Sequence, residues 1–226
     1  KIEDFNPADH LKNYDWDYVT VAPPVTEFIN ELSHSRHYDV YLNIYEGEDE
    51  KESSGLQLIQ TLETLNLPFT GAESKFYRCT REEMQAAAEA HQIRFARGFH
   101  AESHEDLKQA DDLSYPLIVK HPNSFASTGL TKESRVTNSD ELKFQFERMS
   151  NEYGSARVEE FIEGREFSCM VVENADDAQS PFAYAPAEVQ FPEGETFLHE
   201  AAKWYSFDIF VVPLADDALA ARIQDV

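Results

Sequence analysis

Cysteine, positive charge and long apolar runs are all scarce in this sequence of 226 residues. The two cysteines, Cys79 and Cys169, match no metal-ligand spacing and suggest no disulfide framework, so we expect a reducing compartment, the cytoplasm. No run approaches the roughly 20 apolar residues that a membrane-spanning helix needs. The sequence does not begin with methionine, so a leader removed before residue 1 stays an open alternative.

The scarcity of positive charge is the strongest signal in the composition. Nineteen Lys and Arg residues stand against 43 Asp and Glu residues, which gives a formal net charge of −24. Such a surface repels polyanions, which argues against nucleic acid and anionic membranes as partners. Hydrophobic residues still make up 42% of the chain and aromatic residues 12%, enough for packed cores. A lysine or arginine at the end of a strand is therefore a stronger functional candidate here than in a neutral protein.

Residues 1–74 follow the pattern of a βαβ unit. The runs at 14–24 and 38–47 and the short "PFTG" segment predict strands. Within 53–68, Leu58, Leu62 and Leu65 fall on one helical face. A strand, a helix and another strand in this order imply a parallel sheet. We therefore expect an N-terminal α/β lobe.

Two further lobes are predicted downstream, so the fold class is α/β built from α+β lobes. In 75–155, the helix "TREEMQAAAEAHQ" opens with a capping box between Thr80 and Glu83, and the helices "ESHEDLKQADD" and "TNSDELKFQFERMSNE" flank the strand "YPLIVK". In 156–226, the strands "ARVEEFI", "REFSCMVVE" and "FAYAPAEVQF" precede a final helix. We expect a hinge at 156–162 and a cleft between these two lobes.

Lys120 ends the apolar strand 117–119 and is followed by a loop of small residues up to Gly129. In open α/β sheets, ligands bind just outside the carboxyl ends of strands. Small residues let backbone N–H groups approach phosphate oxygens. A lysine that merely reaches solvent is the alternative, and the glycine–lysine–serine order of a Walker A loop is missing. The loop nevertheless favours a phosphate site.

Four glutamates crowd the segment "VEEFIEGREF". Exposure to solvent, at a strand edge and in the following turn, is sufficient to account for Glu160 and Glu163. Glu166 differs, because it follows a turn and enters an apolar strand. Its carboxylate could accept hydrogen bonds from both hydroxyls of a ribose, and the backbone of "EEFI" could present its polar edge to adenine.

These segments together resemble the ATP-grasp ligases, and most of all the D-alanine–D-alanine ligase group. The shared features are the lysine after a buried strand, the small-residue loop, "VEEFIEGREFS" and "EAAKWY" at 200–205. The earlier stretch "EGEDEKESSGLQLIQTLETLNLPFTG" resembles the N-terminal lobe of that group. The resemblance runs from about residue 38 to 213 and is most specific in "VEEFIEGREF". It implies an ATP-grasp fold preceded by a Rossmann-like lobe, with the nucleotide held between two lobes.

The resemblance also assigns roles. Lys120 matches the lysine at the α- and β-phosphates, the loop 127–129 closes over them, and Lys203 lies in a second covering loop. Glu159 and the next three residues match the hinge strand that reads adenine, and Glu166 matches the ribose-binding glutamate. Lys120 and Lys203 carry the catalytic role. The full set assigned to the nucleotide is Arg81, Lys120, Ser127, Thr128, Gly129, Glu159, Glu160, Phe161, Ile162, Glu166 and Lys203.

Several positions depart from the family pattern. Arg81 stands where a second phosphate-binding lysine is expected, and arginine keeps the charge with a different geometry. Ala126 replaces a serine and Trp204 a tyrosine on the substrate side, which puts a peptidoglycan substrate in doubt. The family's metal-binding acid and Glu-x-Asn motif are expected after Val226, and its opening strand before residue 1. No residue of the printed sequence is therefore assigned to Mg²⁺.

The resemblance implies a ligase that joins a carboxylate to an amine (or a thiol) through an acylphosphate, with ATP and Mg²⁺ as cofactors. Small carboxylates and amines are the expected substrates, and a homodimer is compatible with this interpretation. The printed segment alone is expected to be inactive. The main alternative is an ATP-binding regulatory module with an ATP-grasp fold and no catalysis. A structural scaffold is a third alternative, but it leaves the Lys120 loop and Glu166 unexplained.

Overall fold

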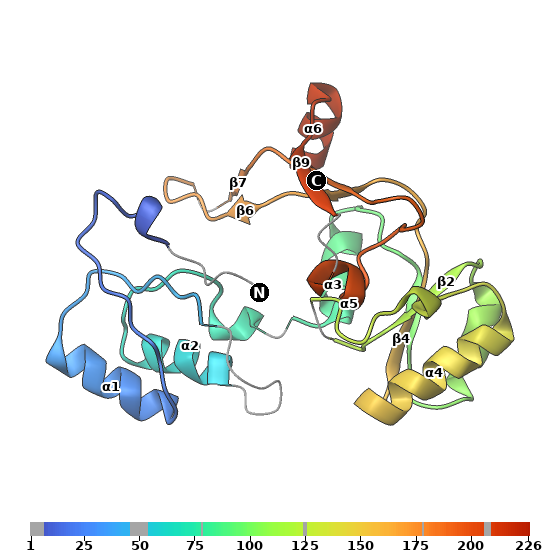
Figure 1. Ribbon diagram of the computed structural model, residues 1–226, viewed down its shortest axis with the longest axis horizontal. Coiled ribbons are helices and arrows are strands. Elements are labelled where there is room, and N and C mark those ends of the chain that lie inside the picture. Colours follow the sequence, from blue (N-terminus) through green and yellow to red (C-terminus); the bar gives the residue numbers. More distant parts are fainter. Residues whose placement is uncertain (1–6, 46–53, 78, 124–125, 178, 206–208) are drawn as a thin grey trace. The chain divides into compact units, whose positions relative to one another are not determined.

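The computed structural model divides the chain into two compact units, Lys1–Cys79 and Thr80–Val226. Figure 1 labels the helices and strands of both units. The structure describes residues 7–45, 54–77, 79–123, 126–177, 179–205 and 209–226. The limits of the three predicted lobes, at 74/75 and 155/156, stay predictions.

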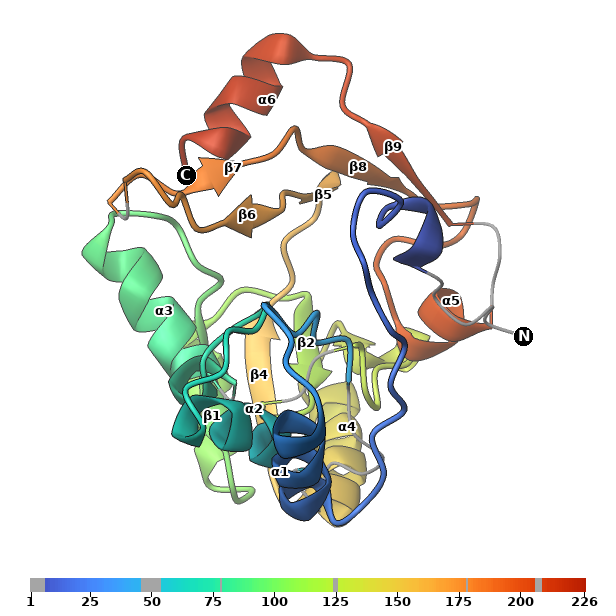
Figure 2. The ribbon, with the colours of Figure 1, turned by 90° about the vertical axis from the view of Figure 1, so that its left-hand side faces the viewer.

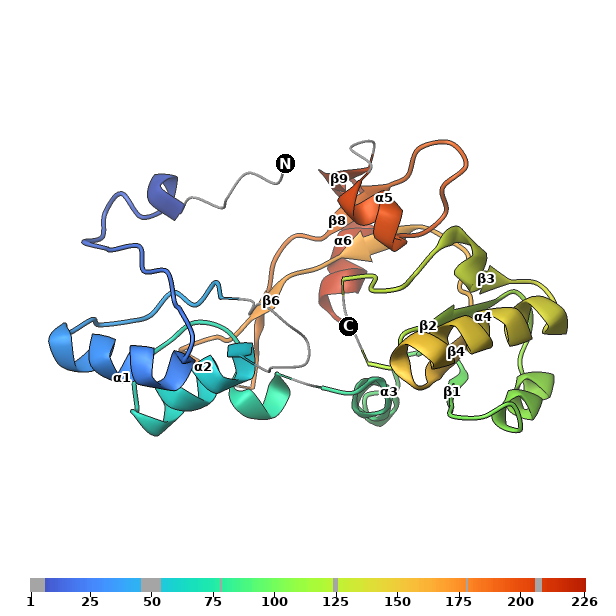
Figure 3. The same cartoon turned by 60° about the horizontal axis from the view of Figure 1, so that its bottom comes forward.

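Two helices, α1 (Val25–Ser35) and α2 (Ser54–Thr64), form the core of the first unit. They lie side by side in Figures 1 and 3. Their contact buries apolar side chains three or four residues apart, which is the helical period. The buried side chains are Val25, Ile29, Leu58 and Leu62. The helix predicted within 53–68 is thus confirmed from Ser54 onward.

The predicted parallel sheet of the first unit is reduced to one parallel bridge, between Tyr41 and Phe69. The strand predicted at 14–24 is wrong, because this segment has no strand residue and its tyrosines are exposed. The strand predicted at 38–47 contributes only the bridge, and its last two residues lie outside the described part. A β-rich run becomes a strand only where a second run lies beside it. The described part of this unit offers such a neighbour at Tyr41 alone.

The second unit contains a four-stranded antiparallel sheet in the order β1-β4-β2-β3. Its strands are β1 (Gly98–Ala101), β2 (Leu117–Lys120), β3 (Arg135–Val136) and β4 (Ala156–Glu160). The predicted strand "YPLIVK" is confirmed as β2, whereas β1 was not expected, since "GFHA" is too short to show a pattern. β4 lies between β1 and β2, so residues 156–160 of the predicted hinge form a central strand of this sheet.

Helix α4 (Ser139–Tyr153) packs on one face of this sheet, beside β2 and β4 in Figures 2 and 3. Asn138 is the N-cap residue, and its side chain accepts hydrogen bonds from two backbone amides of the first turn. Gly154 ends the helix with a left-handed φ of 84°. The buried side chains Leu142, Phe146 and Met149 lie three or four residues apart, which is the helical period.

Helix α3 (Arg81–Ala90) begins with the predicted capping box. The hydroxyl of Thr80 accepts from the Glu83 amide at 3.1 Å, and the Glu83 carboxylate accepts from the Thr80 amide at 2.7 Å. The helix predicted at 102–112 is a shorter 3₁₀ helix, Asp106–Asp112. Local signals therefore located both elements, although they did not determine the type of the second.

The rest of the second unit holds a sheet in the order β5-β8-β9, a two-stranded ribbon of β6 and β7, and helices α5 (Glu200–Trp204) and α6 (Asp217–Gln224). The strands are β5 (Glu166–Ser168), β6 (Val171–Val172), β7 (Phe182–Ala183), β8 (Ala187–Gln190) and β9 (Phe210–Pro213). The single strands predicted at 165–173 and 182–191 are each divided in two. In the second, Pro186 lies at the break, since proline has no N–H to donate to a ladder.

Candidate functional site

The register of β2 and β4 brings Lys120, Arg157 and Glu159 to one face of the four-stranded sheet. Lys120 pairs with Arg157, and Ile118 pairs with Glu159. Successive side chains of a strand point to opposite faces, so these three charged residues share one face. The intervening valines point the other way, into the core under α4. The sheet therefore has one apolar face and one charged face.

Glu159 is the centre of the charged face. Its side chain is only 4% exposed, and its two carboxylate oxygens bind different cations. Oε1 accepts from Nε of Arg157 at 3.0 Å, and Oε2 forms an ion pair with Nζ of Lys120. Burial lowers the pKa of Lys120 below its ordinary value, while the Glu159 carboxylate opposes this shift. The predicted role of Glu159 at adenine stays a prediction; its carboxylate lies against Lys120.

Arg157 extends the cluster from the sheet to helix α3. Its Nη1 lies 3.1 Å from Oε1 of Glu82, and its Nη2 lies 2.9 Å from Oε1 of Gln85. Arg81, at the start of the same helix, interacts electrostatically with Glu159 and Arg157, and burial lowers its pKa. Three cationic side chains thus surround Glu159, in a chain with a net charge of −24. This arrangement is suited to a ligand that brings negative charge.

The predicted phosphate loop lies against the segment that carries Lys203. The Ser127 hydroxyl donates to the backbone oxygen of Leu198 at 2.8 Å, and the Gly129 amide donates to the Glu200 carboxylate at 2.8 Å. The indole N–H of Trp204 donates to the Ala126 backbone oxygen at 3.1 Å. Two of the loop's predicted phosphate donors, Ser127 and Gly129, are therefore bonded to the α5 region in this structure. Residues 124 and 125 of this loop lie outside the described part.

Gly129 has a second, structural requirement. Its φ of +67° lies in the left-handed region, and an added Cβ would come within 2.8 Å of the Tyr153 ring. A glycine at this position is thus explained by the loop's conformation without a phosphate. Its predicted contact with ATP stays a prediction, as does that of Thr128.

Glu166 and Lys203 lie near each other in the second unit. Burial raises the pKa of the Glu166 carboxyl, and the charge of Lys203 opposes the shift. Lys203 Nζ lies 5.5 Å from the centre of the Trp204 ring. A half-buried carboxylate and a cation can bind neighbouring polar groups of one ligand, which agrees with the predicted ribose and phosphate contacts without testing them.

The other predicted adenine residues point in different directions. The Glu160 carboxylate accepts from the Ser114 amide at 2.9 Å and lies 3.4 Å from Arg97. Phe161 packs edge-on against Phe197, with ring centres 5.5 Å apart. Ile162 is 70% exposed. Their side chains therefore form no single pocket, and an adenine contact would have to use the backbone, as the sequence predicts.

Arg157 is the functional candidate that sequence reasoning missed. The available signal was the alternation in "ARVEE", in which two apolar residues alternate with Arg157 and Glu159. This alternation predicts that the two charged residues share a face. It does not predict that the face is buried, because that depends on helix α3.

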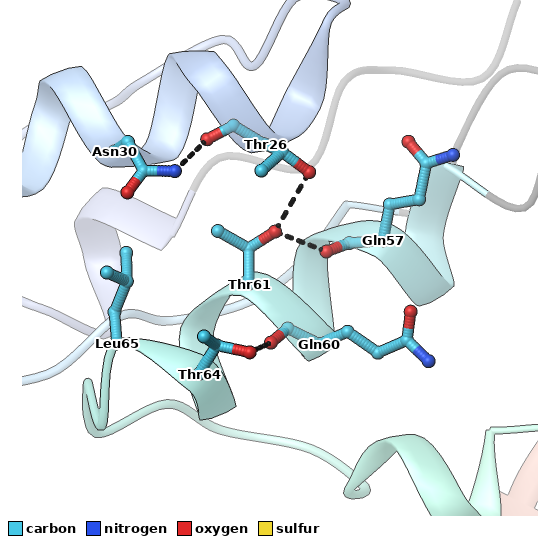
Figure 4. A pocket seen from close by; sticks show the side chains of 7 residues that line it. All are labelled: Thr26, Asn30, Gln57, Gln60, Thr61, Thr64 and Leu65. Carbon is cyan, nitrogen blue, oxygen red and sulfur yellow. Dashed lines mark hydrogen bonds between the residues drawn. The ribbon is translucent and has the colours of Figure 1, made fainter.

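A separate cavity of about 250 Å³ lies in the first unit, between α1 and α2 (Figure 4). Its polar side chains are largely bonded within their own helices: Thr61 and Thr64 hydroxyls each donate to a carbonyl four residues earlier, at 2.7 Å. None of the predicted site residues lines it. The lining residues are Thr26, Asn30, Gln57, Gln60, Thr61, Thr64 and Leu65. With no charged group, this cavity offers no chemistry comparable to the Lys120 cluster.

A metal site is not found in the part of the chain that the structure describes. There, no three His, Cys, Asp or Glu side chains lie together in a way that could hold a metal ion. The described residues therefore provide no preassembled metal site. Among the same residues, no helix is long and apolar enough to cross a membrane.

Comparison with known proteins identifies the family. The family described as "D-ala D-ala ligase C-terminus" matches residues 86–216, more than half of the chain. The chain belongs to this family. The sequence resemblance to the D-alanine–D-alanine ligase group is thereby confirmed.

Curated members named D-alanine–D-alanine ligase show how much of a whole protein the match covers. The protein of Cupriavidus necator is 38% identical over 87 residues, which are 38% of this chain and 25% of that protein. The protein of Cupriavidus taiwanensis is 32% identical over 124 residues, 53% of this chain and 36% of that protein. The chain thus matches between 25% and 36% of the length of these relatives.

Solved structures show the ATP-grasp fold over most of the chain. D-alanine–D-alanine ligase from Bacillus anthracis, in complex with ATP, matches with a TM-score of 0.63 and 18% identity, over 88% of this chain and 60% of that one. VanG D-Ala:D-Ser ligase from Enterococcus faecalis matches with a TM-score of 0.59 and 20% identity, over 74% of this chain and 49% of that one. At these identities the likeness concerns the fold. The expected mixed α/β architecture of ATP-grasp ligases is confirmed.

Proposed function

We propose that this member of the D-Ala–D-Ala ligase family provides the nucleotide site of an ATP-dependent carboxylate–amine (or carboxylate–thiol) ligase. The observation that supports this most is the Lys120 cluster. Lys120 ends strand β2, its ammonium is held by the buried Glu159 carboxylate, and Arg81 lies nearby. Positive charge fixed at a strand end is suited to binding phosphate groups.

The proposed reaction has two steps. A carboxylate oxygen of the first substrate attacks the terminal phosphorus of ATP, the P–O bond to ADP breaks, and an acylphosphate forms. The amine of the second substrate then attacks the acyl carbon, inorganic phosphate leaves, and the nitrogen loses a proton. Lys120 and Lys203 would stabilise the negative charge on the transferring phosphoryl group.

The remaining residues would hold the nucleotide. Glu166 would bind the ribose hydroxyls, and the backbone of 159–162 would meet the edge of adenine. Arg81 would meet phosphate, and the loop 127–129 would approach the phosphates after leaving its contacts with the α5 region. Mg²⁺ belongs to the proposal through the family alone; the described residues include no group of three metal-ligating side chains, and no step above depends on it. A Rossmann-like first lobe, a cytoplasmic location and a homodimer are likewise proposed from the resemblance.

Titration of the chain with ATP and with adenosine tests the nucleotide site. Lys120→Ala should weaken ATP binding about tenfold to a hundredfold and leave adenosine binding unchanged, because one charge-assisted contact to phosphate is lost. Glu166→Ala should weaken both ligands. Lys143→Ala, which removes an exposed lysine from α4, is the matched control and should change neither. Equal effects of the first two variants on both ligands would contradict the assigned roles.

Release of ADP by the natural protein, with Mg²⁺ and a panel of amino acids and small carboxylic acids, tests the ligase activity. D-Alanine is the first substrate to try, because the curated relatives are named for it. Turnover with one acid and one amine supports the ligase. ATP binding with no turnover on any substrate favours the regulatory module, and absence of ATP binding contradicts both.

A further inference from the structure

Helix α3 carries Arg81 but has almost no apolar attachment to the rest of its unit. All ten of its residues are described, and none of them is buried. Helices in globular proteins usually dock through an apolar stripe, which supplies most of their stability. A helix without a fully buried residue needs another attachment if its first residue is to stay near Lys120.

Arg157 provides such an attachment. The residue is 2% exposed, and three of its nitrogen atoms reach three different acceptors. Nε binds Glu159 at 3.0 Å in its own strand, and the two terminal nitrogens bind Glu82 at 3.1 Å and Gln85 at 2.9 Å on α3. Glu82 and Gln85 are three residues apart and therefore lie on one face of the helix. A planar guanidinium can hold three acceptors in fixed directions, whereas a lysine has a single nitrogen.

The strand side of this attachment is also fixed. Glu159 is held between Arg157 and Lys120. Its neighbour across the ladder is Gly98, where an added Cβ would come within 2.6 Å of Cγ of Glu159. The missing side chain at Gly98 leaves the space that the glutamate occupies. A continuous series of contacts therefore runs from α3 through Arg157 and Glu159 to Lys120.

We propose that Arg157 is a positioning residue that sets the distance between Arg81 and Lys120, so that both cations can meet neighbouring phosphates of one nucleotide. This inference rests on the proposed function for the ligand, although the attachment of α3 can be measured without one. Arg157 does not itself bind phosphate, because it is buried and directed to Glu82, Gln85 and Glu159. Its effect on binding passes through Arg81.

The first measurement is hydrogen exchange of the α3 amides without any nucleotide. Arg157→Lys keeps the charge but has one nitrogen in place of the three that bind Glu82, Gln85 and Glu159. The α3 amides should therefore exchange about tenfold faster, while those of α4 stay unchanged. Gln85→Ala gives a second variant that leaves the sheet intact, and it should show a smaller change in the same direction. Met84→Gln, an exposed position of the same helix, is the matched control. Unchanged exchange in α3 for both Arg157→Lys and Gln85→Ala would overturn the proposal.

The second measurement is a double-mutant cycle with ATP and adenosine. Arg157→Lys should weaken ATP binding about tenfold and adenosine binding less than twofold. In that background Arg81→Ala should have little further effect, because Arg81 is already displaced. Additive losses would show that Arg157 binds phosphate directly and would overturn the proposal. Equal losses for ATP and adenosine would show a purely structural role and overturn it as well. If the unmutated chain binds no ATP, the proposed function fails, and the exchange data still decide whether Arg157 attaches α3.

Discussion

Helices α4 and α3 lie on opposite sides of the same sheet, next to strand β4 (Figure 2), and they are attached by different forces. Helix α4 buries Leu142, Phe146 and Met149 against the strands. Helix α3 has no fully buried residue and is held by the guanidinium of Arg157. Apolar packing is non-directional, and its strength depends little on pH. A polar attachment depends on the charges of its groups and on the geometry of its hydrogen bonds. The comparison indicates that the α4 side provides most of the apolar packing, while the α3 side carries the proposed site.

The largest expected effect lies on the α4 side. Phe146→Ala should lower the free energy of unfolding by about 3–5 kcal/mol, because it leaves a cavity in the core. Phe144, two residues earlier on the same helix, is 65% exposed, so Phe144→Ala should cost less than about 0.5 kcal/mol. Denaturant unfolding of both variants measures the difference. Equal costs would show that α4 does not dock as described.

Gly98→Ala tests the charged side of the same sheet. The new methyl group would meet the Glu159 side chain and the Val158 backbone oxygen, so we expect a loss of about 1–3 kcal/mol in unfolding free energy from overpacking. ATP binding should weaken more than adenosine binding, because Lys120 loses its fixed partner. Calorimetry with both ligands measures this. Wild-type stability together with wild-type ATP affinity would refute the tight contact between Gly98 and Glu159.

The pH dependence of ATP binding tests the charged face of the sheet, the one that carries Lys120. Burial lowers the pKa of Lys120, and only the protonated ammonium attracts phosphate. ATP affinity should therefore fall as the pH rises through a range below that of an ordinary lysine. Lys120→Arg should remove this fall, since a guanidinium stays charged to higher pH. If ATP affinity depends on pH in the same way for the unmutated protein and for Lys120→Arg, Lys120 is not the group whose titration weakens binding.

The smallest predicted effect is that of salt. The net charge of −24 creates repulsion in the folded state, and added salt screens exposed charges. The melting temperature should therefore rise by a few degrees, roughly what 1 kcal/mol produces, between low salt and about 0.5 M NaCl. Hydrogen exchange in α3 should change little, because Arg157 is buried and its bond to the neutral Gln85 is not screened, although Glu82 is about half exposed. Faster exchange in α3 at high salt would show that its attachment is an exposed ion pair.

Elements with local signals were predicted well from the sequence. The capping box of Thr80 and Glu83 located the start of α3, and the apolar run before Lys120 located the strand β2. The motif "VEEFIEGREF", together with the Lys120 loop and "EAAKWY", indicated the family, which the match over residues 86–216 confirms. These features depend on neighbouring residues in the chain, which a sequence displays directly.

Elements that depend on distant partners were predicted poorly. The strand expected at 14–24 has no neighbouring strand among the residues that the structure describes, and β1 was missed although it pairs with the central strand β4. The contacts of Ser127 and Gly129 with the α5 region span 71 residues. No pattern within either segment indicates that the small-residue loop will contact the α5 region.

The local sequence was sufficient for the helix starts, for the strand that ends at Lys120 and for membership of the family, because capping, periodicity and motifs act over a few residues. The tertiary structure decided which charges meet. Arg157 lies beside Lys120 because the antiparallel register opposes these two residues, 37 positions apart in the chain, and Glu159 lies two residues further along the same strand, opposite Ile118. Their burial depends on helix α3, which lies more than 60 residues earlier. Burial in turn lowers the pKa of Lys120, so the electrostatics of the site exist only once these segments have come together.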